Sequence, residues 1–283
     1  MRHTSAAFAN LSVKYPMRYI FDNDLHIHSF LSLCSKDPEQ TPEAILQYAK
    51  DNGLKTVVLT DHYWDSAVSG ASSFYSAQNY ERQSQSKPLP QAEGIRFLFG
   101  CETDVDKDMK LGIPKERFDD FDFIVIPTTH LHMKGFTITE EDASSVEGRA
   151  RVWVERLEGL LDMKLPFGKI GLAHLACPLI APKREDYLKV LELLPEEKLY
   201  SLFGKCAHLG VGIELNSSDM SFSCEEAETV LRMFKIAKEC GCKFYMGSDA
   251  HHPKGLKEAK GIFERAIDML GLTEDDKFII KQI

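Results

Sequence analysis

The stretch KTVVLTDH, residues 55–62, contains a continuous apolar run that ends in polar residues. A strand in a parallel sheet is covered on both faces, so it consists of an unbroken apolar run rather than of alternating apolar and polar positions. We therefore expect a buried parallel strand here, with Asp61 and His62 at its carboxyl end. Whether the rest of the chain repeats this pattern decides the fold class.

Further segments on either side of residues 55–62 show the same pattern. They are MRYIFDNDLHIH (17–28), IRFLFGCETDV (95–105), FDFIVIPTTH (121–130), KIGLAHLA (169–176), VGIELNSS (211–218) and KFYMGSDAHH (243–252). Helical patterns lie between the strands, and we expect helices over residues 41–53, 146–162, 223–241 and 254–271. Strands that alternate with helices indicate parallel βαβ units, which form either a closed barrel or an open doubly wound sheet.

Each of these seven runs ends in residues that can bind a metal or a substrate. In chain order they are Asp24, His26, His28, Asp61, His62, Glu102, His130, His174, Asn216, Asp249 and His251. In a barrel the carboxyl ends of all strands surround one mouth, where barrel enzymes have their active sites. An open sheet brings together only the ends at a switch point. The distribution over all seven strands therefore favours a barrel.

His26 and His28 are two residues apart, so on a strand both side chains point to one face and can bind one ion. Neutral imidazoles balanced by carboxylates suit zinc, manganese or iron. Taken singly, each residue has an ordinary structural explanation; His174, for example, fits a hydrogen-bonded core histidine. Together the strand ends supply six histidines and, in Glu102 and Asp249, two carboxylates that can act as ligands, which is more than one ion binds. We therefore expect two to three divalent metal ions.

The composition is that of an ordinary globular chain, with 283 residues, 43% hydrophobic and 27% charged. We find no linker, so we expect one domain over residues 1–283, with its core at about 20–255; residues 69–91 resemble an exposed insertion. A net charge of −9 argues against binding of long nucleic acids. No segment resembles a signal peptide or a membrane span, so we expect a cytoplasmic protein with free cysteines. The sequence does not indicate an oligomeric state.

The motifs DLHIHS (24–29), LTDH (59–62), GCETDV (100–105) and GSDAHH (247–252) resemble, in this order, the four motifs of the PHP family, named for polymerase and histidinol phosphatase. TTH (128–130) and GLAH (171–174) match the two intervening histidine positions. The resemblance covers most of the chain. It implies an α/β protein with a distorted (β/α)7 TIM-like barrel and a metal site at the carboxyl ends of the strands.

The resemblance also implies a cluster of up to three ions. The implied ligands are His26, His28, Glu102 and Asp249 for the first ion, Glu102, His130 and His174 for the second, and His62 and His251 for the third. Glu102 would bridge the first two ions, and Asp61 would orient a histidine ligand. Family members usually carry a further Asp or His where this chain has Leu33 and Cys34. Whether Cys34, Asp37 or neither completes the third site stays open.

The resemblance implies an enzyme that hydrolyses a phosphate ester with metal-activated water. We expect Glu102, Asp61 and Asp249 to act in catalysis. We expect substrate contacts from His132, Lys134, Asn216 and His252. The expected substrate is a small phosphomonoester such as histidinol phosphate. The alternatives are phosphodiesterase activity on nucleotides or short oligonucleotides, and a metal-binding regulatory module without catalysis.

Overall fold

A computed structural model describes residues 16–281. The strands are β1 (Asn23–Ile27), β2 (Thr56–Leu59), β3 (His62–Tyr63), β4 (Arg96–Thr103), β5 (Phe123–Pro127), β6 (Ile170–Ala173), β7 (Gly212–Asn216) and β8 (Lys243–Gly247). The α-helices are α1 (Pro42–Asn52), α2 (Tyr80–Gln83), α3 (Val146–Asp162), α4 (Arg184–Leu193), α5 (Glu196–Leu209), α6 (Ala227–Glu239) and α7 (Pro253–Leu270). All seven expected strands form, and β3 is a short addition that the sequence analysis missed.

The strands form a parallel sheet in the order β1-β2-β4-β5-β6-β7-β8, with β3 paired to β4. Between β8 and β1 a single parallel bridge joins Ile27 to Ala250. Beside it the Asp249 amide donates to the His26 carbonyl at 2.7 Å, and the His28 amide donates to the Ala250 carbonyl at 3.2 Å. The sheet is therefore nearly closed, which confirms the distorted TIM-like barrel.

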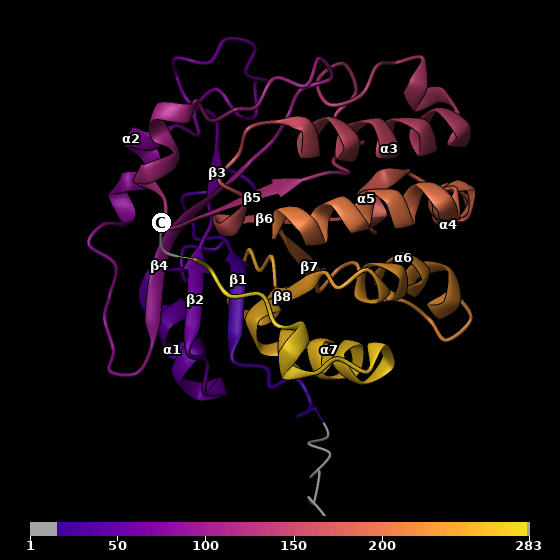
Figure 1. The fold of residues 1–283 in the computed structure, drawn as a ribbon. Helices are drawn as coiled ribbons and strands as arrows, with labels where there is room; N and C mark the ends of the chain where they lie inside the picture. The colour runs from indigo at the N-terminus through magenta and orange to yellow at the C-terminus, as the bar shows by residue number, and fades with distance from the viewer. Residues whose placement is uncertain (1–15, 282–283) are drawn as a thin grey trace, which may run out of the picture.

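The helices pack around the outside of the strands (Figure 1). α3 contacts α4 and α5, α6 contacts α4, α5 and α7, and α7 contacts α1. The sequence analysis missed α4 and α5, a short pair that Pro195 separates. It also placed the start of α6 at residue 223, whereas residues 224–226 form a turn and the helix begins at Ala227. No helix in residues 16–281 has the length and apolarity needed to cross a membrane.

The amino-terminal end of the barrel is filled with apolar side chains. One cluster inside it consists of Leu25, Val58, Phe123, Val125, Ala173, Tyr245, Phe278 and Ile280. Its last two members come from the C-terminal segment, which the Phe278 amide fastens to the Phe244 carbonyl at 2.8 Å. This cluster, which we call the apolar plug, closes one end of the barrel. Polar side chains inside the barrel therefore gather at the other end.

Gly171 of β6 lies against this plug, and its replacement by alanine tests how tightly the plug is packed. A Cβ atom there would contact the Tyr245 ring and would lie 2.6 Å from Cζ of Phe123. Both neighbours are rigid aromatic rings, so we expect Gly171→Ala to lower the free energy of unfolding by about 1–3 kcal/mol in urea denaturation. Gly261→Ala in α7 is the control because it meets no atom within 4 Å. Equal stability of the two variants would contradict the packing.

The expected exposed insertion at residues 69–91 is wrong in part. Tyr75, Gln78 and Gln83 are buried. Nε2 of Gln83 donates to the carbonyls of Asp61 and His62, the latter at 2.7 Å. These contacts need a polar side chain in the interior, which a polar, Ser-rich sequence does not reveal. The segment therefore packs against the carboxyl end of the barrel and contributes to its mouth.

Candidate active site

The carboxyl ends of the strands bring the expected metal-binding residues together. The strand β1 and the residue after it carry His26 and His28, β3 begins at His62, β4 carries Glu102, and the segments after β5, β6 and β8 carry His130, His174, Asp249 and His251. The register of β1 against β2 shifts between Asp24 and Ile27. Nε2 of His26 nevertheless lies 3.1 Å from Nε2 of His28, so both rings reach one place.

Glu102 lies at the centre of this group, and its carboxylate oxygens face imidazole rings. Its Oε2 atom lies 2.8 Å from Nδ1 of His62 and 3.3 Å from Nε2 of His28. Its Oε1 atom lies 3.6 Å from Nε2 of His174 and 3.8 Å from Nε2 of His130. The two oxygens thus face different sets of histidines, which is the arrangement that a bridging carboxylate needs.

Asp249 is the second carboxylate of the cluster. Its Oδ1 atom lies 3.0 Å from Nε2 of His28, and its Oδ2 atom lies 3.4 Å from Nε2 of His174. Asp249 and His174 both adopt positive φ angles, 52° and 59°. Residues other than glycine rarely adopt this backbone conformation, and it occurs often at functional sites. The backbone therefore accepts strain where these two side chains meet.

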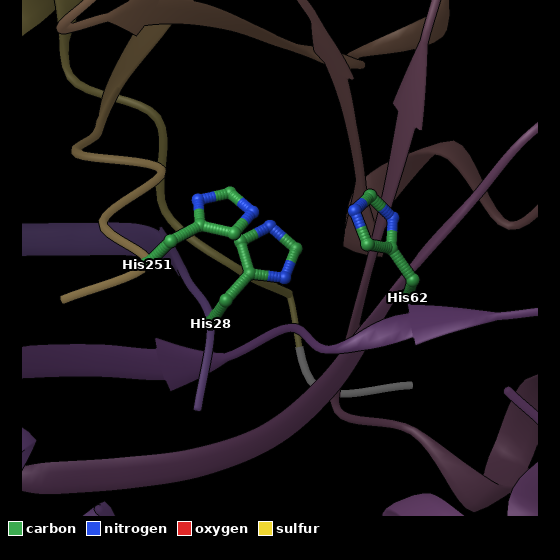
Figure 2. Close-up of side chains that lie close together, drawn as sticks. All are labelled: His28, His62 and His251. Carbon is green, nitrogen blue, oxygen red and sulfur yellow. The ribbon is translucent and has the colours of Figure 1, made fainter. Parts of the chain in front are cut away.

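Several groups of side chains have potential ligand atoms that all lie within 4.8 Å of one another. They include His26, His28 and Glu102; Glu102, His130 and His174; His26, His174 and Asp249; and His28, His62 and His251. Figure 2 shows the last of these groups, in which the His28 ring lies 4.3 Å from the His251 ring and 4.6 Å from the His62 ring. The third member of this group is His28. The sequence analysis had left open whether Cys34, Asp37 or neither joins His62 and His251.

The donor atoms in this cluster fit divalent metal ions. Both oxygens of Glu102 and Nδ1 of His62 are buried, and none of them makes a hydrogen bond of suitable geometry within residues 16–281, although Nδ1 of His62 lies 2.8 Å from Oε2 of Glu102. Burial alone would favour a neutral Glu102, but His62 and His26 hold its pKa well below its usual range. Burial and the neighbouring His28 lower the pKa of His251 to about 4, so its ring is neutral at pH 7. Burial would also lower the pKa of His28, but Asp249 and Glu102 raise it to about 9, so a metal ion bound there must displace a proton from His28. Anionic carboxylates and neutral imidazoles are the forms that bind metals.

Buried carboxylates hold the outer nitrogens of two of these histidines. Nδ1 of His26 lies 2.6 Å from Oε1 of Glu214, and Nδ1 of His130 lies 2.9 Å from Oδ2 of Asp104. In each case the contact leaves Nε2 directed toward Glu102, as in carboxylate–histidine pairs at metal sites. The sequence analysis missed both carboxylates. Asp104 follows Glu102 by two residues and Glu214 precedes Asn216 by two, so strand alternation offered a signal for each.

His28 is held through a serine. Its Nδ1 atom lies 2.9 Å from the Ser32 hydroxyl, and that hydroxyl donates to Oδ1 of Asp61 at 2.6 Å. Asp61 also accepts hydrogen bonds from the amide and hydroxyl of Ser29, at 2.8 Å and 2.6 Å. Asp61 is therefore placed to position the DLHIHS motif (residues 24–29), and it does not face the substrate.

A cavity of about 360 Å³ opens above the cluster. Its lining residues are Cys34, His62, Phe74, Tyr75, Glu102, His130, His132, Met133, His174, Leu179, Asp249 and His251. Cys34, which the sequence analysis left open as a metal ligand, and His132, which it expected to contact the substrate, both line this cavity. Phe74 and Tyr75 come from the segment that was expected to be an exposed insertion.

Four other expected site residues do not line this cavity and have partners elsewhere. Oδ1 of Asp37 accepts the Glu39 amide at 2.9 Å, in a turn. Lys134 is exposed and lies 3.9 Å from Glu140. Asn216 is buried, and its Oδ1 accepts the amide and hydroxyl of Ser218 at 2.9 Å and 2.8 Å; Nδ1 of His252 accepts the Gly255 amide at 3.1 Å and caps α7. Local turn and cap contacts thus use these side chains.

Comparisons with known proteins show the family to which this chain belongs. The PHP domain model matches residues 24–218. Two proteins named "Probable phosphatase", from Thermoanaerobacter sp. (strain X514) and Thermoanaerobacter pseudethanolicus (strain ATCC 33223 / 39E), are each 26% identical over 265 residues, which is 92% of this chain and 89% of theirs.

A solved structure has the same fold. Histidinol phosphate phosphatase from Lactococcus lactis subsp. lactis, complexed with zinc, L-histidinol and phosphate, aligns with a TM-score of 0.55. The sequence identity is 14%, and the alignment covers 92% of this chain and 99% of that one. This likeness supports the barrel, and the PHP domain model matches well over half of the sequence. This chain therefore belongs to the PHP domain family.

Proposed function

We propose that the protein hydrolyses small phosphomonoesters in this cavity with the help of two to three divalent metal ions, which are zinc, manganese or iron. The observation that carries this proposal is the position of Glu102 between two groups of histidines, with neither oxygen hydrogen-bonded. A buried carboxylate without donors is costly unless cations compensate it. Histidinol phosphate is the first substrate to test.

We propose the following ligands for the ions. They are His26, His28, Glu102 and Asp249 for the first, Glu102, His130 and His174 for the second, and His62 and His251 together with His28 for the third. Bound ions would lower the pKa of a water molecule and neutralise charge on the phosphate. Glu102 and Asp249 contribute the negative charge that keeps the ions in place, and Asp61 positions His28 through Ser32.

The cavity sets the size and the polarity of the substrate. Its volume of about 360 Å³ lies at the low end for small-molecule sites. Phe74, Met133 and Leu179 give one part of its wall an apolar surface on which an imidazole or another flat leaving group can pack. A long polynucleotide does not fit this volume. We also propose a reducing location such as the cytoplasm, because all seven cysteines are free.

The decisive experiment combines metal analysis with a choice of substrates. We expect two to three ions per chain by elemental analysis of protein purified without chelator, and release of inorganic phosphate from histidinol phosphate or another monoester. Cleavage of bis(4-nitrophenyl) phosphate in preference to every monoester would instead favour the phosphodiesterase. Metal binding without hydrolysis of either ester would favour the regulatory module. Absence of metal after addition of zinc or manganese would overturn the proposal.

Glu214→Gln tests the support of the first ion. Oε1 of Glu214 contacts His26, and Oε2 accepts the His174 amide at 3.1 Å, so the glutamine keeps the shape but loses the charge that fixes the His26 ring. We expect metal affinity to fall by about 10–100-fold, measured by competition with a chelating dye. The control is Glu226→Gln, whose carboxylate pairs with Arg184 outside the cluster. Unchanged affinity in Glu214→Gln would argue against His26 as a ligand.

A further inference from the structure

The cavity has no cationic side chain for a phosphate. No Lys or Arg is among its lining residues within residues 16–281. The two buried arginines of α3 are engaged elsewhere: Arg149 donates to the carbonyls of Leu131 and Ile180 at 3.0 Å and 2.6 Å, and Arg156 donates to Asp104 at 2.8 Å. A phosphoryl oxygen that no ion binds must therefore accept a hydrogen bond from a neutral donor.

Tyr75 is the residue in the cavity lining that carries a hydroxyl group. Its side chain is fully buried, and its hydroxyl has no hydrogen-bond partner among the residues that the structure describes. A buried phenol without a partner costs about 1–3 kcal/mol of folding free energy, and an acceptor bound in the cavity would offset this cost. Tyr75 is among the residues that line the cavity in which we propose that the substrate binds, and its ring lies 5.2 Å from Phe74 and 5.7 Å from His62 of the same lining.

Neighbouring aromatic rings hold the Tyr75 ring in place. The ring lies edge-on to His62, 5.7 Å between centroids, and packs against Trp64 at 5.8 Å and Phe136 at 5.7 Å. Its backbone is held in a turn, where its amide donates to the Ser72 carbonyl at 3.1 Å. A rigid donor costs little reorganisation when charge develops on its acceptor. A tyrosine phenol has an ordinary pKa of about 10, so it keeps its proton at neutral pH.

We propose that the Tyr75 hydroxyl donates a hydrogen bond to a non-bridging phosphoryl oxygen of the bound monoester and is a catalytic residue. This inference rests on the proposed function. The phosphoryl oxygens carry most of the charge in the transition state of phosphoryl transfer, so a fixed donor there stabilises it. The proton stays on the tyrosine, and no covalent bond to the enzyme forms.

Tyr245 offers a matched control. Its hydroxyl is also buried and without a hydrogen-bond partner in residues 16–281, but its ring packs in the apolar plug against Phe123 and Phe278, 5.3 Å and 6.0 Å away. Tyr245→Phe removes the same atom from a buried ring that does not line the cavity. A general effect of losing a buried hydroxyl would therefore appear in both variants.

The test compares Tyr75→Phe and Tyr245→Phe with the wild type, each loaded with metal. We expect Tyr75→Phe to lower kcat/KM for 4-nitrophenyl phosphate by about 10–100-fold and to weaken binding of inorganic phosphate, measured by calorimetry, with unchanged metal content. The reduction in kcat/KM should be equal for phenyl phosphate and 4-nitrophenyl phosphate. Tyr245→Phe should stay within about twofold of the wild type in all three readouts.

Three results would overturn the assignment of Tyr75. They are unchanged kcat/KM and phosphate affinity, a loss that follows a loss of metal, and a loss that grows with the pKa of the leaving group, which would place the hydrogen bond on the ester oxygen. Phosphate binding separates this inference from the proposed function. A wild type that binds phosphate but hydrolyses no monoester defeats the proposed function and leaves the phosphate contact to be judged by calorimetry. A wild type that does not bind phosphate defeats both.

Discussion

Replacement of Glu102 by glutamine is expected to lower kcat by about 10³-fold or more and to reduce the metal content. Both oxygens of Glu102 face imidazole nitrogens, with the shortest distance 2.8 Å to His62. A glutamine has the same shape but no charge, and one of its terminal atoms becomes a donor. The change removes a shared anionic ligand from both proposed ions, so it weakens the centre that would activate water and neutralise the phosphate.

The measurements for Glu102→Gln are steady-state kinetics, elemental analysis and thermal unfolding. Glu185→Gln is the control, because the Glu185 side chain is 81% exposed on α4. We expect the Glu102 variant to fold, since the substitution conserves volume in a buried site. Turnover near that of the wild type, with the metals retained, would remove Glu102 from its central role and with it the proposed arrangement of the ions.

Replacement of Arg156 by methionine is expected to lower the free energy of unfolding by about 3–5 kcal/mol. The Arg156 side chain is 3% exposed, and it donates to Oδ1 of Asp104 at 2.8 Å. It also donates to the carbonyls of Thr128 and Val105, at 2.9 Å and 3.0 Å. Without the guanidinium, the buried Asp104 loses its arginine partner and several carbonyl groups lose a donor, and breaking a buried ion pair on one side is strongly destabilising.

Urea denaturation at neutral pH measures this effect, with Arg151→Met as the control. Arg151 lies on the same helix, but its side chain is 54% exposed and pairs with Glu155 on the surface. The double variant Arg156→Met with Asp104→Asn should be less destabilised than the sum of the two single changes, because it removes both charges. A loss of less than about 1 kcal/mol in Arg156→Met would show that the buried pair contributes little.

Much of the fold was predictable because buried parallel strands leave a strong local signal. An unbroken apolar run such as TVVL in β2 indicates a buried strand, and its end marks the place where polar side chains collect. The PHP family and the barrel, both expected from such runs and motifs, are confirmed. The sequence analysis gave no helix for α4 and α5, where Pro195 interrupts the helical pattern between the two. β3 was missed because two residues carry no periodicity.

The sequence by itself determined which residues can bind metals, since their types and their places after successive strands are local properties. Only the tertiary structure decided which of them meet. Along the chain it stayed open whether Cys34, Asp37 or neither completes the third site, yet the close group that holds His62 and His251 is completed by His28. Tyr75 lies in a polar segment that resembles a loop, but its ring is packed between Trp64 and Phe136. Contacts between segments far apart in the chain depend on how the barrel closes and what folds over its mouth, and no local pattern encodes either.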